Sequence, residues 1–188
     1  MWQQVALPIA AFLSSFASVE PDQLFRQVQQ KAILAIYAVD FEQDPDQDIY
    51  SPWRYLICFQ NSSVFLDIED AYDGEHLCLN WRETTELEHY LQTLTEAGLW
   101  KPWSVEAPEP LGPLLGGTLM QAFYAKDNAC FASNGSWTQG NLHLYKGLRL
   151  ECEAHALTVF SNGVGLYAGV NTNLQPAFEE IYDWFACY

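Results

Sequence analysis

Basic residues are scarce in this chain of 188 residues, where eight Lys and Arg stand against 24 Asp and Glu. The imbalance is concentrated in the first hundred positions, which hold sixteen acids and four bases, a net charge of −12 (16 − 4), while the remainder carries −4. A field of that sign repels the phosphates of nucleic acids and anionic membranes, and it attracts cations and basic proteins. The charge therefore argues against a nucleic-acid partner and favours a protein with a basic surface.

The familiar catalytic and cofactor motifs are missing as well. The chain has no phosphate-binding P-loop, no G-x-S-x-G hydrolase turn and no H-E-x-x-H zinc motif. Gly163, Gly165 and Gly169 have the wrong spacing for a dinucleotide fingerprint. His76 and Cys78 lie two residues apart, but zinc would require two further ligands that the sequence does not supply. The sequence thus predicts no catalytic residue, no metal site and no cofactor, and it indicates a binding protein more than an enzyme.

Paired cysteine motifs are also lacking, since the five cysteines are widely spaced and form no C-x-x-C. An odd number of isolated cysteines, in a chain long enough to fold without cross-links, is typical of reduced thiols and predicts a cytoplasmic protein. Residues 1–19 contain no charged side chain. Their apolar stretch has no preceding Lys or Arg and is too short and too polar to cross a bilayer, so no transmembrane segment is expected.

The same uncharged segment has the pattern of an amphipathic helix. Its apolar side chains recur with the 3.6-residue period of an α-helix: Val5, Ile9, Phe12, Leu13 and Phe16. Two interpretations remain open for this N-terminal arm. It either packs on the protein's own core or binds a partner.

The first half of the chain predicts a short helix and an antiparallel meander. Helix-start signals around Pro21 predict a helix over residues 21–30, and the apolar run of residues 32–41 predicts a strand. Three more strands are expected, joined by an Asn-Ser-Ser turn and an Asp-Gly turn: 53–60, 64–69 and 76–81. Thr85 and Glu88 have the spacing of a capping box, which predicts a helix that ends near Gly98.

The second half resumes after a connection rich in Pro and Gly at residues 101–117. Its expected strands are 119–126, 130–132, 142–145, 148–153, 157–161 and 164–169. Asn173 is a candidate helix cap, and the spacing of Phe178, Ile181 and Phe185 predicts a C-terminal helix with its apolar face inward. The whole chain, 1–188, is therefore predicted to be a single α+β domain. It would contain a mostly antiparallel sheet of about six to eight strands in two meander-like halves, with N-terminal, middle and C-terminal helices.

The candidate contact residues lie in two kinds of loop. Asp44, Asp46 and Asp48 imitate the start of a calcium loop, but the positions that require Gly and Glu hold Ile49 and Tyr55, so a solvated acidic loop is expected. In residues 133–141 Trp137 stands among small polar residues, and Trp103 follows Lys101-Pro102. A rigid aromatic side chain flanked by small hydrogen-bonding residues is typical of a binding anchor.

These features predict a non-catalytic acidic accessory factor, namely a regulator, assembly factor or inhibitor, that engages a basic partner surface. Two alternatives remain. One is a small-molecule-binding, barrel-like protein with a cavity lined by aromatic side chains: Tyr55, Phe65, Phe123, Tyr145 and Phe160. The other is a hydrolase that uses the carboxylates of Asp67 and Glu69, which lie on one face of a predicted strand.

Overall fold

The computed structural model describes residues 21–40, 52, 54–70, 76–96, 101–104, 111–126, 129–131, 137–139, 144–161, 165–171 and 183–187, with the backbone alone for strands β5, β7 and β8. The predicted N-terminal helix and the acidic loop with Asp44, Asp46 and Asp48 lie outside this part of the chain. Among the residues described, no helix is long and apolar enough to cross a membrane.

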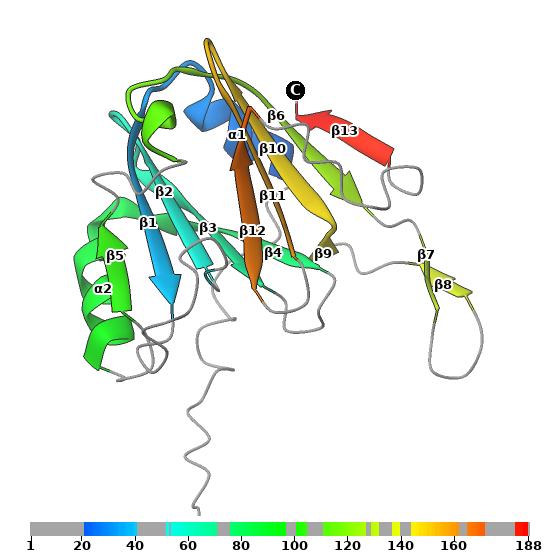
Figure 1. Cartoon of the computed structure of the whole chain (residues 1–188), viewed down its shortest axis with the longest axis horizontal. Helices are drawn as coiled ribbons and strands as arrows, with labels where there is room; N and C mark the ends of the chain where they lie inside the picture. Colours follow the sequence, from blue (N-terminus) through cyan, green and yellow to red (C-terminus); the bar gives the residue numbers. More distant parts are fainter. Residues whose placement is uncertain are drawn as a thin grey trace, which may run out of the picture.

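The fold is mostly antiparallel β, built from two sheets (Figure 1). The first sheet has the order β5 (Lys101–Ser104), β1 (Ile33–Asp40), β2 (Arg54–Phe59), β3 (Val64–Asp70), β4 (Leu77–Glu83) and β9 (Leu144–Tyr145). The second has the order β12 (Leu166–Val170), β11 (Ala156–Ser161), β10 (Gly147–Cys152), β6 (Leu119–Lys126) and β13 (Asp183–Cys187). Strands β7 (Ala129–Phe131) and β8 (Trp137–Gln139) form a separate hairpin.

The meander predicted for residues 53–81 is confirmed as strands β2, β3 and β4. Asn61, at φ 53°, supplies the left-handed residue that the tight turn between β2 and β3 requires. Because side chains alternate along a strand, Tyr55 and Ile57 of β2 face the second sheet while Arg54 and Leu56 face away from it. This alternation separates one shared core between the sheets from a smaller cluster on the outer face of the first sheet.

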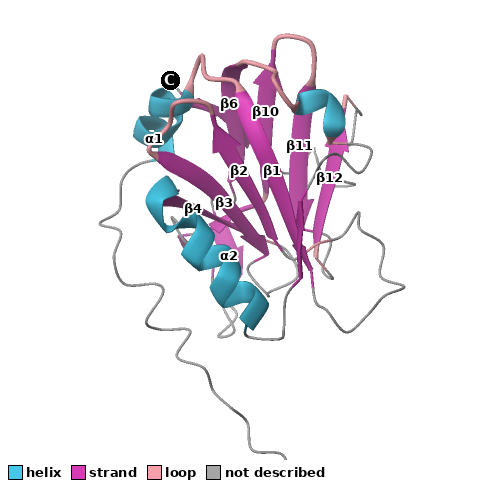
Figure 2. Ribbon diagram, turned by 90° about the vertical axis from the view of Figure 1, so that its left-hand side faces the viewer, coloured by secondary structure: helices cyan, strands magenta, loops and turns pink. Residues whose placement is uncertain are grey.

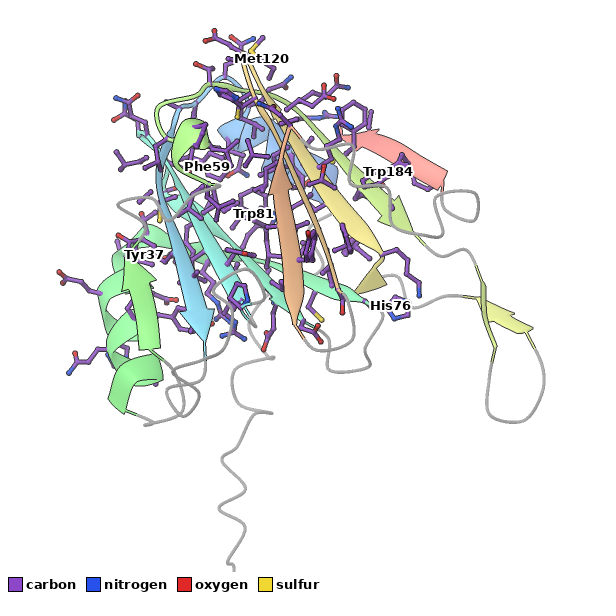
Figure 3. All side chains as sticks on the ribbon, viewed as in Figure 1. Tyr37, Phe59, His76, Trp81, Met120 and Trp184 are labelled. Carbon is purple, nitrogen blue, oxygen red and sulfur yellow. The ribbon has the colours of Figure 1, made fainter. Side chains whose placement is uncertain are left out.

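The shared core draws fully buried aliphatic side chains from both sheets. They are Ile36, Ile57, Leu66, Ile68 and Leu77 on the first sheet, and Leu119, Leu148, Leu150, Leu157, Val159 and Leu166 on the second. Phe59 and Trp81 stack between the sheets with ring centroids 6.3 Å apart (Figure 3). Such interleaved packing is what holds two sheets face to face.

Two features close one side of this sandwich. Strand β9 pairs with β4 of the first sheet, and the chain then passes through Lys146 directly into β10 of the second sheet. Helix α1 (Pro21–Val28) packs beside β13. Its Phe25 meets Trp81 edge to face, with ring centroids 5.0 Å apart. The sheets are therefore joined both by a shared stretch of chain and by a helix.

Helix α2 (Leu87–Glu96) covers the outer face of the first sheet (Figure 2). It contributes Tyr90 to a cluster with Leu56 and Phe65. The predicted helix is confirmed, but the predicted capping box of Thr85 and Glu88 is wrong. A 3-10 turn, Thr84–Glu86, precedes α2, and the cap position is Glu83, which makes no side-chain cap bond. The amide of Thr84 donates to the carbonyl of Ser63 at 2.8 Å, so the β3–β4 pairing fixes where the turn begins.

The C-terminal helix is wrong over residues 183–187, which form the edge strand β13. This segment pairs with β6, and Phe185 stacks on Tyr124 with centroids 5.6 Å apart. Phe185, predicted to face inward from a helix, keeps 38% of its surface exposed. The free edge of β6 offers hydrogen bonds that reward an extended conformation, and this tertiary pairing overrides the helical spacing. Of the predicted α+β fold, the mostly antiparallel sheet is therefore confirmed, and the fold as a whole is mostly β.

Candidate functional site

Among the described residues, several charged and polar side chains form a buried ionic network on the outer face of the first sheet, beneath α2. Its members are Arg54, Asp67, Glu69, Arg82 and Tyr90. Three adjacent strands and α2 supply them. Arg54 of β2 lies directly opposite Glu69 of β3, while Arg82 of β4 is diagonal to Asp67. The side chain of Asp67 is fully buried, and those of Arg54 and Arg82 are 10% and 14% exposed.

Asp67 is the centre of this network. One of its oxygens, Oδ2, accepts a hydrogen bond from Nε of Arg82 at 2.7 Å and another from the hydroxyl of Tyr90 at 3.1 Å. The Tyr90 hydroxyl in turn accepts a hydrogen bond from Nη1 of Arg54. Nε of Arg54 lies 3.3 Å from Oδ1 of Asp67, although neither atom makes a hydrogen bond. Nη2 of Arg54 contacts a carboxylate oxygen of Glu69.

The ring of Tyr90 links the charges to the helix. The guanidinium carbon of Arg82 lies 4.4 Å from the centroid of this ring, and that of Arg54 lies 5.7 Å from it. Both cations therefore lie within the range of a cation–π interaction. Tyr90 thus joins α2 to the sheet through its hydroxyl, its ring face and its apolar packing on Phe65.

Burial controls protonation in this network. Burial raises the pKa of Glu69, and Arg54 offsets only part of that rise. Burial also raises the pKa of Tyr90, with the charge of Asp67 adding to the effect. For Arg54, burial alone would lower the pKa, but Asp67, Tyr90 and Glu69 together raise it above its usual value. The guanidinium groups stay charged and the phenol stays protonated at neutral pH.

This arrangement is better suited to holding α2 on the sheet than to acid–base catalysis by the carboxylates. Asp67 and Glu69 do share one strand face, as the hydrolase alternative requires, but both contact arginines. A carboxylate that acts as a general base needs a free path to a substrate proton. Asp67 has no exposed surface, because α2 lies over it.

The residues expected to line a ligand cavity do not come together. Tyr55 and Tyr145 belong to the shared core, whereas Phe65 lies on the opposite face of the first sheet, under α2. Phe160 lies on the outer face of the second sheet, where it packs on Tyr167. In the described portion of the chain, a hollow beside Phe25 and Cys187 has a cavity volume of about 10 Å³. That is room for about one water molecule and is far below the range usual for small-ligand sites.

The sequence-predicted contact residues are placed only in part. The backbone of Trp103 lies in β5, paired with Ala38, and that of Trp137 lies in β8, paired with Phe131. Both segments were predicted to be loops, and this prediction is wrong at both tryptophans, because each lies in a short strand. Asp44, Asp46 and Asp48 lie outside the described residues.

Exposed acids are found at one end of the first sheet. Glu83, Glu86 and Glu88 are all exposed where β4 leads into α2. The acidic segment 41–51 joins β1 to β2 at the other end, since Arg54 pairs with Glu69 while Glu83 pairs with Val64. The three exposed glutamates and the segment 41–51 are therefore connected to opposite ends of the first sheet.

His76 and Cys78 belong to no candidate metal site among the described residues. His76 lies just before β4, and the described residues contain no group of three or more side chains suited to a metal. Comparison of the chain with protein-family models, with curated proteins and with solved structures finds no match in any of the three.

Sequence reasoning missed Arg54, Arg82 and Tyr90 as members of a site. A signal was present, because β2 and β4 each contain an arginine, and β3 contains three carboxylates, two of which, Asp67 and Glu69, alternate onto one face. Charged residues on the same face of consecutive strands predict cross-strand ion pairs once the register is known. The register itself comes only from the three-dimensional pairing.

Proposed function

We propose that the protein is a non-catalytic acidic binding protein, acting as a regulator, assembly factor or inhibitor, that engages a basic surface of a partner protein. The observation that carries this proposal is that the charge excess remains once the buried ionic network is accounted for. The network contains two arginines and two carboxylates, so it is neutral. Among the first hundred residues this leaves fourteen acids (16 − 2) and two bases (4 − 2), still a net charge of −12.

Half of the basic side chains among the first hundred residues are thereby withdrawn from the surface. Arg54 and Arg82 are two of these four bases, and both are largely buried against carboxylates. They cannot neutralise acids elsewhere on the exterior. An unbalanced surface charge speeds the encounter with a partner of opposite charge and makes that encounter sensitive to salt.

The protonation of the buried groups supports a non-catalytic role. Burial raises the pKa of the Cys58 thiol to about 11 and also raises that of Cys152. A thiol must ionise to act as a nucleophile, so both cysteines are poorly reactive at neutral pH. The raised pKa of Tyr90 has the same consequence for its hydroxyl.

In this proposal Asp44, Asp46 and Asp48 steer the partner, and Trp103 and Trp137 supply buried contact area. Electrostatic steering without anchors gives fast but weak association, whereas aromatic anchors slow dissociation. The reduced thiols of a cytoplasmic protein are part of the same proposal.

The test is affinity capture of the native protein from cell extract at low and at moderate ionic strength. We expect one stoichiometric protein partner at about 50 mM salt, and a large loss of that partner at about 300 mM, where the Debye length falls well below 10 Å. Recovery of no stoichiometric partner at low salt would overturn the proposal. Equal recovery at both salt concentrations would overturn its electrostatic basis.

A further inference from the structure

The outer face of the second sheet carries a continuous row of apolar residues. Cross-strand pairing places Trp184 of β13, Ala125 of β6, Gly147 of β10, Phe160 of β11 and Tyr167 of β12 opposite one another in order. Their strand neighbours, such as Leu148 and Val159, belong to the shared core. Because side chains alternate, the row faces away from the core. We refer to these five residues as the outer aromatic row.

The residues of the row pack against one another. The Trp184 ring lies directly over Gly147, where a Cβ atom would stand only 3.0 Å from its Cη2 atom. The rings of Phe160 and Tyr167 are 5.3 Å apart between centroids. All three aromatic side chains are half-buried (Figure 3 labels Trp184). The absence of a side chain at Gly147 therefore leaves room for the end of the indole ring.

This surface is close to neutral in a protein of net charge −16. Next to the row, Arg149 and Glu151 project from the same face of β10 and form an ion pair at 3.0 Å, so their charges cancel. An apolar face of this kind usually packs against another element. The first sheet has α2 on its outer face, whereas none of the described helices covers the outer face of the second sheet (Figures 1 and 2).

The segment that precedes α1 matches this face in charge, pattern and length. Residues 1–19 carry no charge, and their apolar side chains follow a helical stripe from Val5 to Phe16. A helix of residues 5–16 would be about 18 Å long at 1.5 Å per residue. The row crosses five strands, or four spacings of about 4.8 Å, which is about 19 Å. Helix α1, which this segment leads into, packs beside β13, where the row begins with Trp184.

We propose that residues 5–16 pack as an amphipathic helix along the outer aromatic row, as the counterpart on the second sheet of α2 on the first. A second copy of the chain is a poorer occupant, because bringing together two molecules of charge −16 is opposed by their repulsion. The N-terminal arm is then part of the domain and not a partner-binding extension.

Photo-crosslinking of the full-length chain tests the proposal without disrupting the helix. The photoreactive residue p-benzoylphenylalanine replaces Phe12, which lies on the apolar stripe, or Ser14, which lies on the opposite side of the helix. We expect Phe12→p-benzoylphenylalanine to crosslink within the same chain to peptides that contain Phe160, Tyr167 or Trp184, and the Ser14 substitution to give several-fold less of these products. Crosslinks between two chains, crosslinks only to other elements, or no difference between the two positions would each overturn the proposal.

Hydroxyl-radical footprinting gives an independent readout. The variant Ile9→Asp/Phe16→Asp places two charges on the apolar stripe, and Ala11→Asp/Ser14→Asp places the same two charges on the other side of the helix. We expect several-fold faster oxidation of Tyr167 in the first variant and wild-type oxidation in the second, with the core residue Tyr55 unchanged in both. Equal oxidation of Tyr167 in all three proteins would contradict the proposed packing.

Discussion

Replacing Asp67 by Asn should be among the most destabilising conservative substitutions in this protein. The change keeps the shape of the side chain but removes the charge that both Arg54 and Arg82 face. Neither arginine can turn to water, because α2 covers the network and their side chains are 10% and 14% exposed. Removing one partner of a buried ion pair typically costs about 3–5 kcal/mol. Since a domain of this kind has about 5–15 kcal/mol of stability, the loss is a large fraction of the total.

Urea unfolding followed by far-ultraviolet circular dichroism measures this cost. The matched control is Glu151→Gln, which makes the same carboxylate-to-amide change in the Arg149–Glu151 pair, where the side chains are 45% and 36% exposed. An exposed ion pair contributes about 0–1 kcal/mol, so the control should unfold close to the wild type. If Asp67→Asn lost no more stability than Glu151→Gln, the interpretation of the network as a buried clamp for α2 would be wrong.

Three further predictions concern single side chains. Burial raises the pKa of Glu69 in the folded state above the unfolded value of about 4.5. The contribution of the protonated Glu69 to the free energy of unfolding is therefore fully present below the unfolded pKa and is lost as pH rises through the higher folded pKa. Urea unfolding across that window should therefore show the wild type losing stability relative to Glu69→Gln, and a constant difference would contradict this. Gly147→Ala should cost about 1–3 kcal/mol, because its Cβ atom meets Trp184, and the same substitution should cost much less in a Trp184→Leu background. Cys58, with its pKa raised to about 11, should resist iodoacetamide at pH 8 in the folded protein and react in urea, as mass spectrometry of the labelled peptide would show.

The local parts of the fold were predictable from the sequence. Alternating apolar residues and turn signals predicted β2, β3 and β4, and the stripe through Leu87, Tyr90 and Leu91 predicted α2. These patterns depend on neighbours in the chain, and a single sequence contains them in full.

What could not be predicted depends on contacts between distant segments. Residues 183–187 carry a helical spacing but become β13, because β6 offers a free edge about sixty positions earlier in the chain. Trp103 lies in a strand for a similar reason, since the distant strand β1 pairs with β5. Trp137 lies instead in a local hairpin, in which it pairs with Phe131 of β7 only six positions earlier. The buried ionic network was missed because Arg54, Arg82 and Tyr90 meet Asp67 only once the register of three strands and the position of α2 are fixed.

The most direct test of the proposed function compares two variants that change the net charge equally. Asp44→Asn/Asp46→Asn/Asp48→Asn removes three carboxylates from the acidic loop, and Glu83→Gln/Glu86→Gln/Glu88→Gln removes three exposed ones from the far end of the first sheet. The measurement is the amount of partner retained in affinity capture at low salt, relative to the wild type. We predict that the aspartate variant loses most of the partner and the glutamate variant retains it. Equal retention by both variants and the wild type would contradict the proposal that these carboxylates recruit a basic partner.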